Sequence, residues 1–169
     1  LGSYGSPLPN TYNNSYDSYF QPASATSWPY PQGNTATANL KGMMTGSRVK
    51  VLGTSTYLYT VSFYDEKGRP IQVQGTNISG GTDIVTTQYT WAGQPLVLIQ
   101  KQQKTGTNAQ TTVTVTQLTY DELGRLAKTE KKVSNTNVNS GAMPAYKTLA
   151  ENEYDKLGQI KKKKLAPAY

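Results

Sequence analysis

The stretch "SFYDEKGRP" at residues 62–70 returns as "LTYDELGRL" at 118–126 and as "NEYDKLGQI" at 152–160. A fourth, degenerate copy, "QYTWAGQPL" at 88–96, keeps the Tyr and the Gly but has Thr90 in place of the Asp. An active site is normally built once in a chain. A phrase repeated in tandem indicates either a repeated turn or a repeated ligand site.

Each copy has the pattern of a β-hairpin. The Asp carboxylate can cap backbone amides of the turn, and the Gly supplies the positive φ that closes it with a bulge. We expect turns at about residues 64–69, 89–94, 120–125 and 154–159. The residues expected to carry this motif are Tyr64, Asp65, Gly68, Arg69, Tyr89, Gly93, Tyr120, Asp121, Gly124, Arg125, Tyr154, Asp155 and Gly158.

The segments on both sides of these turns have the periodicity of β-strands. In "STYLYTVSFY" (55–64) the large side chains alternate with smaller ones, which is the period of a strand. "RPIQVQG" (69–75) alternates again, with Ile71 and Val73 expected on one shared face. Polar connectors join one hairpin to the next, which is typical of a repeat architecture in which each unit is covered by its neighbours.

Composition favours an all-β fold and excludes several kinds of chemistry. Of 169 residues 36% are hydrophobic, and 13 are Tyr against 2 Phe and 2 Trp, which suits half-exposed strands. The chain has no His and no Cys, which excludes Ser-His-Asp and Cys-His nucleophilic pairs, Cys/His zinc sites and disulfides within this chain. No run of about 18 apolar residues occurs, so we expect no membrane span.

The chain divides into two regions. Residues 1–39 are rich in Tyr, Pro, Asn and Ser, and we expect an extended segment laid over a larger β-surface, with a disordered linker as the alternative. Residues 40–169 hold the hairpins. The net charge is +7, and 10 of the 17 basic residues lie between Arg125 and Lys164, including the run Lys161 to Lys164. We interpret this run as a solvated strand rather than a phosphate or nucleic-acid site, because interleaved Arg and aromatic residues are missing.

The phrases "YDEKGRPIQV", "YDELGRLAKTE" and "YDKLGQIKKK" resemble the YD repeat of Rhs-type proteins, over roughly residues 40–165. That family includes the shells of bacterial polymorphic toxins, the cocoon of insecticidal toxin complexes and the barrel of teneurins. The resemblance implies an all-β ribbon of tandem antiparallel hairpins that spirals into a hollow shell. Members that carry a toxin enclose a C-terminal effector, released at a core segment rich in Asp-Pro-x-Gly and Asn-Pro. No such segment occurs here.

The resemblance implies a non-catalytic structural segment of a secreted or cell-surface bacterial protein. Its partners would be the rest of the same polypeptide, with secretion or outer-membrane machinery or a surface polysaccharide as further possibilities. Gln94 and Gln159 stand where the family has Arg, so we expect weaker, neutral contacts there. A surface binding module for polysaccharide, or a cargo segment held by a secretion complex, is the alternative function.

Three ligand-site hypotheses compete with the turn hypothesis. A calcium site would need several carboxylates in one loop, and each of these turns offers one or two. A glycosidase needs two facing carboxyl groups, whereas the adjacent Asp65 and Glu66 point apart in an exposed turn. A ladder of tyrosines could stack on sugars, but we expect these rings to pack against the next hairpin. We therefore expect no catalysis, no metal and no cofactor, and cross-hairpin contacts for Arg69 and Arg125.

Overall fold

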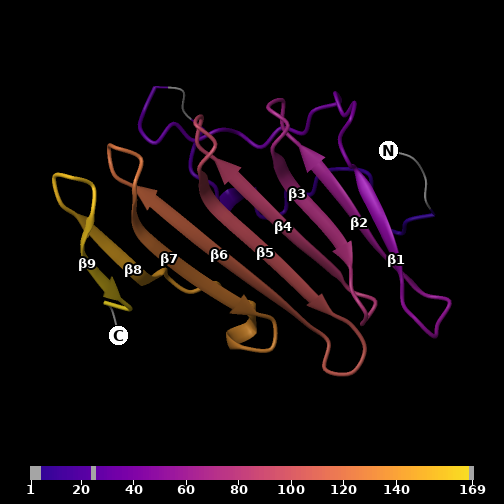
Figure 1. Cartoon of the computed structure of the whole chain (residues 1–169). Helices are drawn as coiled ribbons and strands as arrows, with labels where there is room; N and C mark the ends of the chain where they lie inside the picture. The colour runs from indigo at the N-terminus through magenta and orange to yellow at the C-terminus, as the bar shows by residue number, and fades with distance from the viewer. Residues whose placement is uncertain (1–4, 24–25, 168–169) are drawn as a thin grey trace.

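The computed structural model describes residues 5–23 and 26–167, and it shows one antiparallel sheet whose nine strands lie side by side in sequence order (Figure 1). The all-β prediction and the hairpin order are confirmed. The strands are β1 (Gly46–Lys50), β2 (Tyr57–Tyr64), β3 (Pro70–Thr76), β4 (Thr82–Tyr89), β5 (Pro95–Lys104), β6 (Gln110–Tyr120), β7 (Leu126–Asn135), β8 (Lys147–Tyr154) and β9 (Ile160–Leu165). Two short 3-10 helices, η1 (Asp17–Tyr19) and η2 (Asn139–Gly141), are the helical elements of the described residues.

All four repeated turns lie at the same end of the sheet (Figure 1). They join β2 to β3, β4 to β5, β6 to β7 and β8 to β9, and the register shifts by a bulge beside each turn. The intervening connections, including the one that contains η2, lie at the opposite end (Figure 1). A strictly alternating meander of this kind gives the sheet two chemically different ends.

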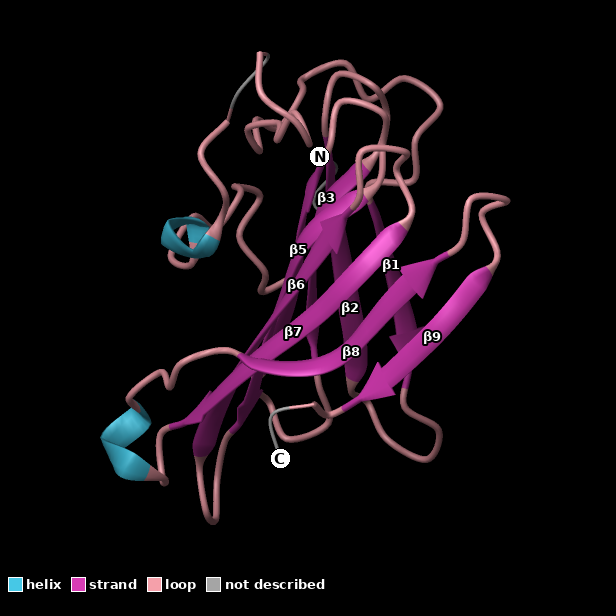
Figure 2. Ribbon diagram, turned by 90° about the vertical axis from the view of Figure 1, so that its left-hand side faces the viewer, coloured by secondary structure: helices cyan, strands magenta, loops and turns pink. Residues whose placement is uncertain are grey.

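Residues 5–23 and 26–39, which we call the cover segment, lie on one side of the sheet (Figure 2). Apart from η1 and an isolated bridge between Pro31 and Thr90, their described backbone is irregular. The many Asn, Ser and Pro residues favour such a conformation, and proline has no N–H group to donate to the hydrogen bonds between strands. The cover segment nevertheless contributes to two buried clusters.

The core lies between the sheet and the cover segment, in two clusters. The first joins Leu8 of the cover segment to Val61, Phe63 and Ile71, with Tyr12 packed against them. In the second, Tyr16, Tyr19 and Phe20 of the cover segment pack against strands β5 and β6, at Leu96, Val97, Ile99, Val113 and Val115. The cover segment therefore supplies apolar area that one sheet face alone would leave exposed to water.

Direct cross-strand neighbours show which residues share the covered face. One row runs from Phe63 through Gln72, Thr86 and Ile99 to Val115. Residues directly opposite each other in an antiparallel pair point to the same side of the sheet. The uncovered face has its own row, which is formed by Ser62, Val73, Val85, Gln100, Thr114 and Val133.

The prediction that Ile71 and Val73 share one face is wrong. The bulge between Phe63 and Tyr64 adds a residue to the returning strand, so Ile71 joins Phe63 in the buried cluster. Val73 pairs with Ser62 and lies on the uncovered face. The positions that alternate with it on the covered side are Gln72 and Gln74, each only 1% exposed.

Within residues 5–23 and 26–167, each outermost strand pairs with a single neighbour: β1 with β2, and β9 with β8. Edge strands carry unpaired backbone groups, and lysines on such strands discourage further pairing. Lys161 to Lys163 are exposed, and Lys164 pairs with Glu151 and Glu153 on β8. No helix in the part of the chain that the structure describes has the length and apolar character needed to cross a membrane.

Candidate functional site: the repeated turns

The turn between β2 and β3 is closed by backbone and side-chain hydrogen bonds that converge on Asp65. The N–H of Asp65 donates to the carbonyl of Arg69 at 3.0 Å, and the N–H of Gly68 donates to the carbonyl of Asp65 at 3.0 Å. The Asp65 Oδ1 accepts the N–H groups of Lys67 and Arg69, each at 2.9 Å. Gly68 has a φ of 75°, which a residue with a Cβ adopts only with strain.

The same backbone pattern recurs in all four turns. The other three closing bonds join residues 90 and 94 at 2.8 Å, 121 and 125 at 2.9 Å, and 155 and 159 at 2.9 Å. Gly93, Gly124 and Gly158 also have positive φ. Asp121 and Asp155 each accept two turn amides through Oδ1, and Thr90 Oγ1 accepts one, from Gln94. The degenerate copy therefore forms the same turn with one capping bond fewer.

The two arginines of the motif link each turn to the next hairpin. Arg69 Nε donates to Asp65 Oδ2 at 2.6 Å, while its Nη1 donates to the carbonyl of Thr90 at 2.9 Å. The guanidinium lies 4.8 Å from the centre of the Tyr89 ring, a distance at which a cation is attracted to the ring face. Arg125 repeats the ion pair, with Asp121 at 2.7 Å, and the ring contact, with Tyr154 at 4.4 Å.

The tyrosines of the motif complete the contacts between hairpins. The hydroxyl of Tyr89 donates to the carbonyl of Pro70 at 3.1 Å, and Tyr120 donates to Pro95 at 2.8 Å. Tyr154 makes the equivalent bond to Leu126 at 2.8 Å. In each case the acceptor is the residue directly after the Arg or Gln of the preceding turn. Tyr64, on the first hairpin, donates instead to the carbonyl of Met44, just before β1, at 2.7 Å.

The two glutamines that replace Arg behave differently. Gln94 Nε2 donates to the carbonyl of Gly124 at 2.7 Å, so a neutral amide still reaches the next turn. Gln159 lies in the outermost hairpin of the described chain, where no further turn follows. Its backbone N–H donates a hydrogen bond to Asp155 Oδ1 at 2.9 Å, which is the same capping bond as in the other copies.

Electrostatics at the turns follow from burial and from these hydrogen bonds. Burial raises the pKa of the Tyr89 phenol, and the positive charge of Arg69 offsets part of this rise. Burial also raises the pKa of Tyr120. Desolvation alone would raise the pKa of Asp121, but hydrogen bonds from Arg125 and Leu123 outweigh it and hold the pKa below its usual value. The phenols are therefore donors, and Asp121 is a stable acceptor, at neutral pH.

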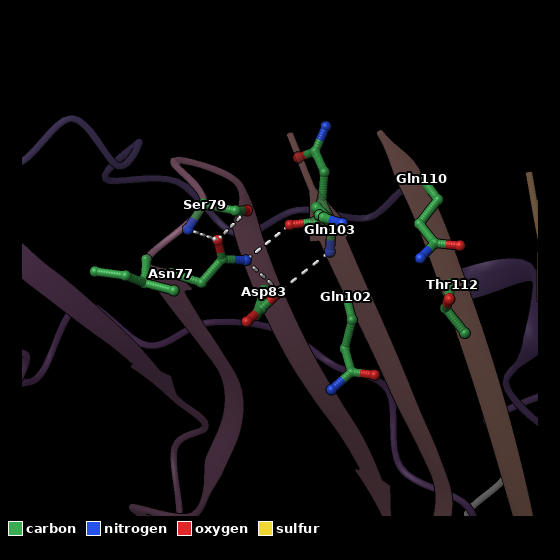
Figure 3. Close-up of a pocket in the computed structure, with 9 residues that line it drawn as sticks. Asn77, Ser79, Asp83, Gln102, Gln103, Gln110 and Thr112 are labelled. Carbon is green, nitrogen blue, oxygen red and sulfur yellow. Dashed lines mark hydrogen bonds between the residues drawn. The ribbon is translucent and has the colours of Figure 1, made fainter. Parts of the chain in front are cut away.

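The opposite end of the sheet repeats this turn with Asn in place of Asp. Asn77 Oδ1 accepts the N–H groups of Ser79 and Gly81, each at 3.1 Å, and the N–H of Asn77 donates to the Gly81 carbonyl at 3.0 Å. Asn77 Nδ2 reaches the next hairpin at the carbonyl of Gln103, 2.7 Å away, and also Asp83 at 3.0 Å (Figure 3). The spacing Asn-x-x-Gly was the signal in the sequence that would have predicted this second turn.

A cavity of about 420 Å³ lies beside this turn, open to solvent and lined by polar groups (Figure 3). Its lining includes Asp83 on β4, Gln102 on β5 and Thr112 on β6, which are neighbouring strands. Asp83 Oδ1 already accepts the N–H of Gln103 at 3.1 Å. Within residues 5–23 and 26–167, no three His, Cys, Asp or Glu side chains gather closely enough to hold a metal ion.

The sequence reasoning missed three buried glutamines, Gln72, Gln74 and Gln88, each 1% exposed on the covered face. Their side chains bind the main chain of the cover segment. Strand alternation alone offers no signal for them, because polar residues that alternate with apolar residues along a strand predict a solvent-exposed face. Comparison with known proteins yielded no protein-family model that matches the chain. No curated protein matches it either.

Proposed function

We propose that this chain is a non-catalytic structural segment of a secreted or cell-surface bacterial YD-repeat protein of the Rhs type. In this role the hairpins form part of a wall, and the motif residues join each hairpin to its neighbour. The wall would continue through further hairpins of the same polypeptide and could enclose an effector. The motif phrases that resemble the YD repeat motivate the family, and the contacts between turns motivate the mechanical role.

The observation that carries the proposal is the periodic bond from a motif tyrosine to the preceding turn. It occurs at Tyr89, Tyr120 and Tyr154, with O···O distances of 2.8–3.1 Å. A ligand site would leave its polar groups open to a partner. Here the carboxylate binds the guanidinium and amides of its own turn, while the phenol and the guanidinium contact the neighbouring hairpin, which is the behaviour of a structural joint.

The proposal is tested in cells of the source organism with an antibody raised against this chain. We expect the antibody to detect a polypeptide much longer than 169 residues, in the medium or on the surface of intact cells. Protease added to intact cells should remove the surface signal, and a cytoplasmic protein in the same samples serves as the control. Detection only inside the cells, at the size of this chain, would contradict the proposal.

A second candidate, a polysaccharide-binding module, rests on Trp91 at the tip of the degenerate turn. Its side chain is 66% exposed, and the ammonium of Lys67 lies 4.5 Å from the ring centre. An exposed ring beside a donor can stack on a sugar. Binding on a glycan array that Trp91→Ala abolishes and Leu123→Ala preserves would favour this function, because Leu123 is even more exposed, at 76%, on the next turn.

A further inference from the structure

The three buried glutamines of the covered face carry an inference about binding. Gln72 and Gln74 lie on β3 and Gln88 on β4, and all three point toward the cover segment. A buried amide is costly unless it is hydrogen-bonded. A surface that is covered only by apolar side chains would leave three buried side-chain amides without hydrogen bonds.

Gln72 and Gln88 each bind one residue of the cover segment through both of its main-chain groups. The N–H of Asn13 donates to Gln72 Oε1 at 2.8 Å, and Gln72 Nε2 donates to the Asn13 carbonyl at 2.8 Å. The N–H of Gln21 donates to Gln88 Oε1 at 2.9 Å, and Gln88 Nε2 donates to the Gln21 carbonyl at 2.7 Å. Each glutamine thus mimics the paired donor and acceptor of a neighbouring strand.

Gln74 has a hydrogen-bond acceptor that the cover segment leaves unpaired. Its Nε2 donates to the carbonyl of Thr11 at 3.1 Å and to Gln72 Oε1 at 2.8 Å. Its Oε1 is buried and accepts no hydrogen bond. An unpaired buried acceptor is a cost that a further N–H donor from a bound peptide would remove.

Aromatic side chains occupy the space around these anchors. Tyr12 meets Phe63 edge to face, with ring centres 6.5 Å apart. Tyr19 lies with its ring 4.3 Å from the ammonium of Lys132, at the far end of the row that contains Gln72. Side chains therefore contribute to binding, but the anchor residues Asn13 and Gln21 are held by their backbone.

We propose that the covered face is a binding site for an extended, aromatic-bearing peptide, recognised through its main chain. The cover segment is the ligand in cis, and the same peptide supplied in trans can replace it. This inference does not depend on the shell function proposed above, because it concerns only the contact between the cover segment and the sheet. It predicts that the backbone, and not the side chain, of Gln21 determines affinity.

The experiment uses the full chain with a protease site inserted between Ala38 and Asn39, which are both exposed. The protein is folded, cleaved and mixed with an excess of a fluorescent synthetic peptide of residues 5–39. Size-exclusion chromatography and fluorescence anisotropy follow the exchange. We expect the cleaved segment to stay bound in the absence of competitor and the labelled peptide to replace it.

Peptide variants separate main-chain from side-chain recognition. N-methylation of Gln21 removes the N–H that Gln88 accepts and should weaken competition by about tenfold to a hundredfold. Replacing Gln21 by Ala keeps that N–H and should change competition less than about threefold. N-methylation of Asn10, whose N–H makes no hydrogen bond with the described residues, is the matched control.

Protein variants test the same contact from the sheet. Gln88→Met preserves the approximate length of the side chain and removes its hydrogen bonds, so it should weaken binding of the peptide to the sheet by about tenfold or more. Gln100→Met, on the uncovered face, should leave binding unchanged. Equal losses from Gln21→Ala and from N-methylation would overturn the proposal. So would a cleaved segment that leaves the sheet and does not rebind, or a sheet that loses its β circular-dichroism signal on cleavage.

Discussion

At the scale of the residue, the carboxylate of Asp65 has several structural roles in one place. It accepts two amides of its own turn and the Nε–H of Arg69, and Arg69 in turn reaches the next hairpin at Thr90. The side chain is only 10% exposed, so these bonds are little weakened by competition with water. Asp155 has the same backbone partners but faces Gln159, and it therefore lacks the ion pair.

Replacing Asp65 by Ala should lower the free energy of unfolding by about 2–4 kcal/mol, because three hydrogen bonds are lost and Arg69 keeps a charge without its partner. The matched change Asp155→Ala should cost about 1 kcal/mol, since only the two amide bonds are lost. Urea unfolding of the full chain, followed by circular dichroism, measures both. Equal costs at the two sites would show that the contact through Arg69 adds nothing.

Half-buried phenols give the molecule a predictable response to alkaline pH. Burial raises the pKa of Tyr120 above its ordinary value of 10.0, so the folded state holds this proton more tightly than the unfolded state. The contribution of Tyr120 is fully present below about pH 10 and is lost as the pH rises through the folded pKa. Stability measured from pH 8 to 11 should fall less steeply in Tyr120→Phe than in the natural chain. Parallel curves would contradict this expectation.

At the scale of the element, the hairpin depends on one backbone conformation. Gly68 has a φ of 75°, and a Cβ there would lie 3.2 Å from the Cε of Met43. Gly68→Ala should therefore cost about 1–2 kcal/mol, mainly from backbone strain. Gly33 is the control, because its φ is not positive and a Cβ would make only an ordinary contact at 3.9 Å. Thermal unfolding of the two variants should differ clearly, and similar melting temperatures would argue against strain at Gly68.

The hairpins were the part of the fold that the sequence made predictable. An Asp, a Gly three residues later and alternating strands on both sides are local signals, and each acts within one turn. Simple alternation ignores the residue that the bulge adds to the returning strand, so it predicts one shared face for Ile71 and Val73, whereas the two lie on opposite faces. The burial of Gln72 and Gln88 depends on residues 59 and 67 positions away, a separation that no local pattern encodes.

At the scale of the whole molecule, the sheet and the cover segment form one core. Two buried clusters combine side chains from both, and the buried glutamines have their partners on the cover segment. The residue two positions after the Arg or Gln of a repeated turn is buried in the first two of these hairpins, which the cover segment packs against, and it is exposed in the last hairpin. Ile71 and Leu96 are 1% and 0% exposed, whereas the equivalent Lys161 is exposed. This position is thus apolar where the cover segment lies and charged on β9.

Residues 40–169 expressed without the cover segment should therefore associate rather than remain monomeric. Removing residues 1–39 exposes Phe63, Ile99 and Val115 to water and leaves Gln72 and Gln88 without their main-chain partners. An apolar face next to open strand edges favours pairing between copies. Light scattering after size-exclusion chromatography measures the effect, with the full chain as the control. Adding the peptide of residues 5–39 during refolding should restore a monomeric fraction, because it covers the same face. A well-dispersed monomer of 40–169 that unfolds cooperatively without the peptide would show that the sheet is stable without its cover.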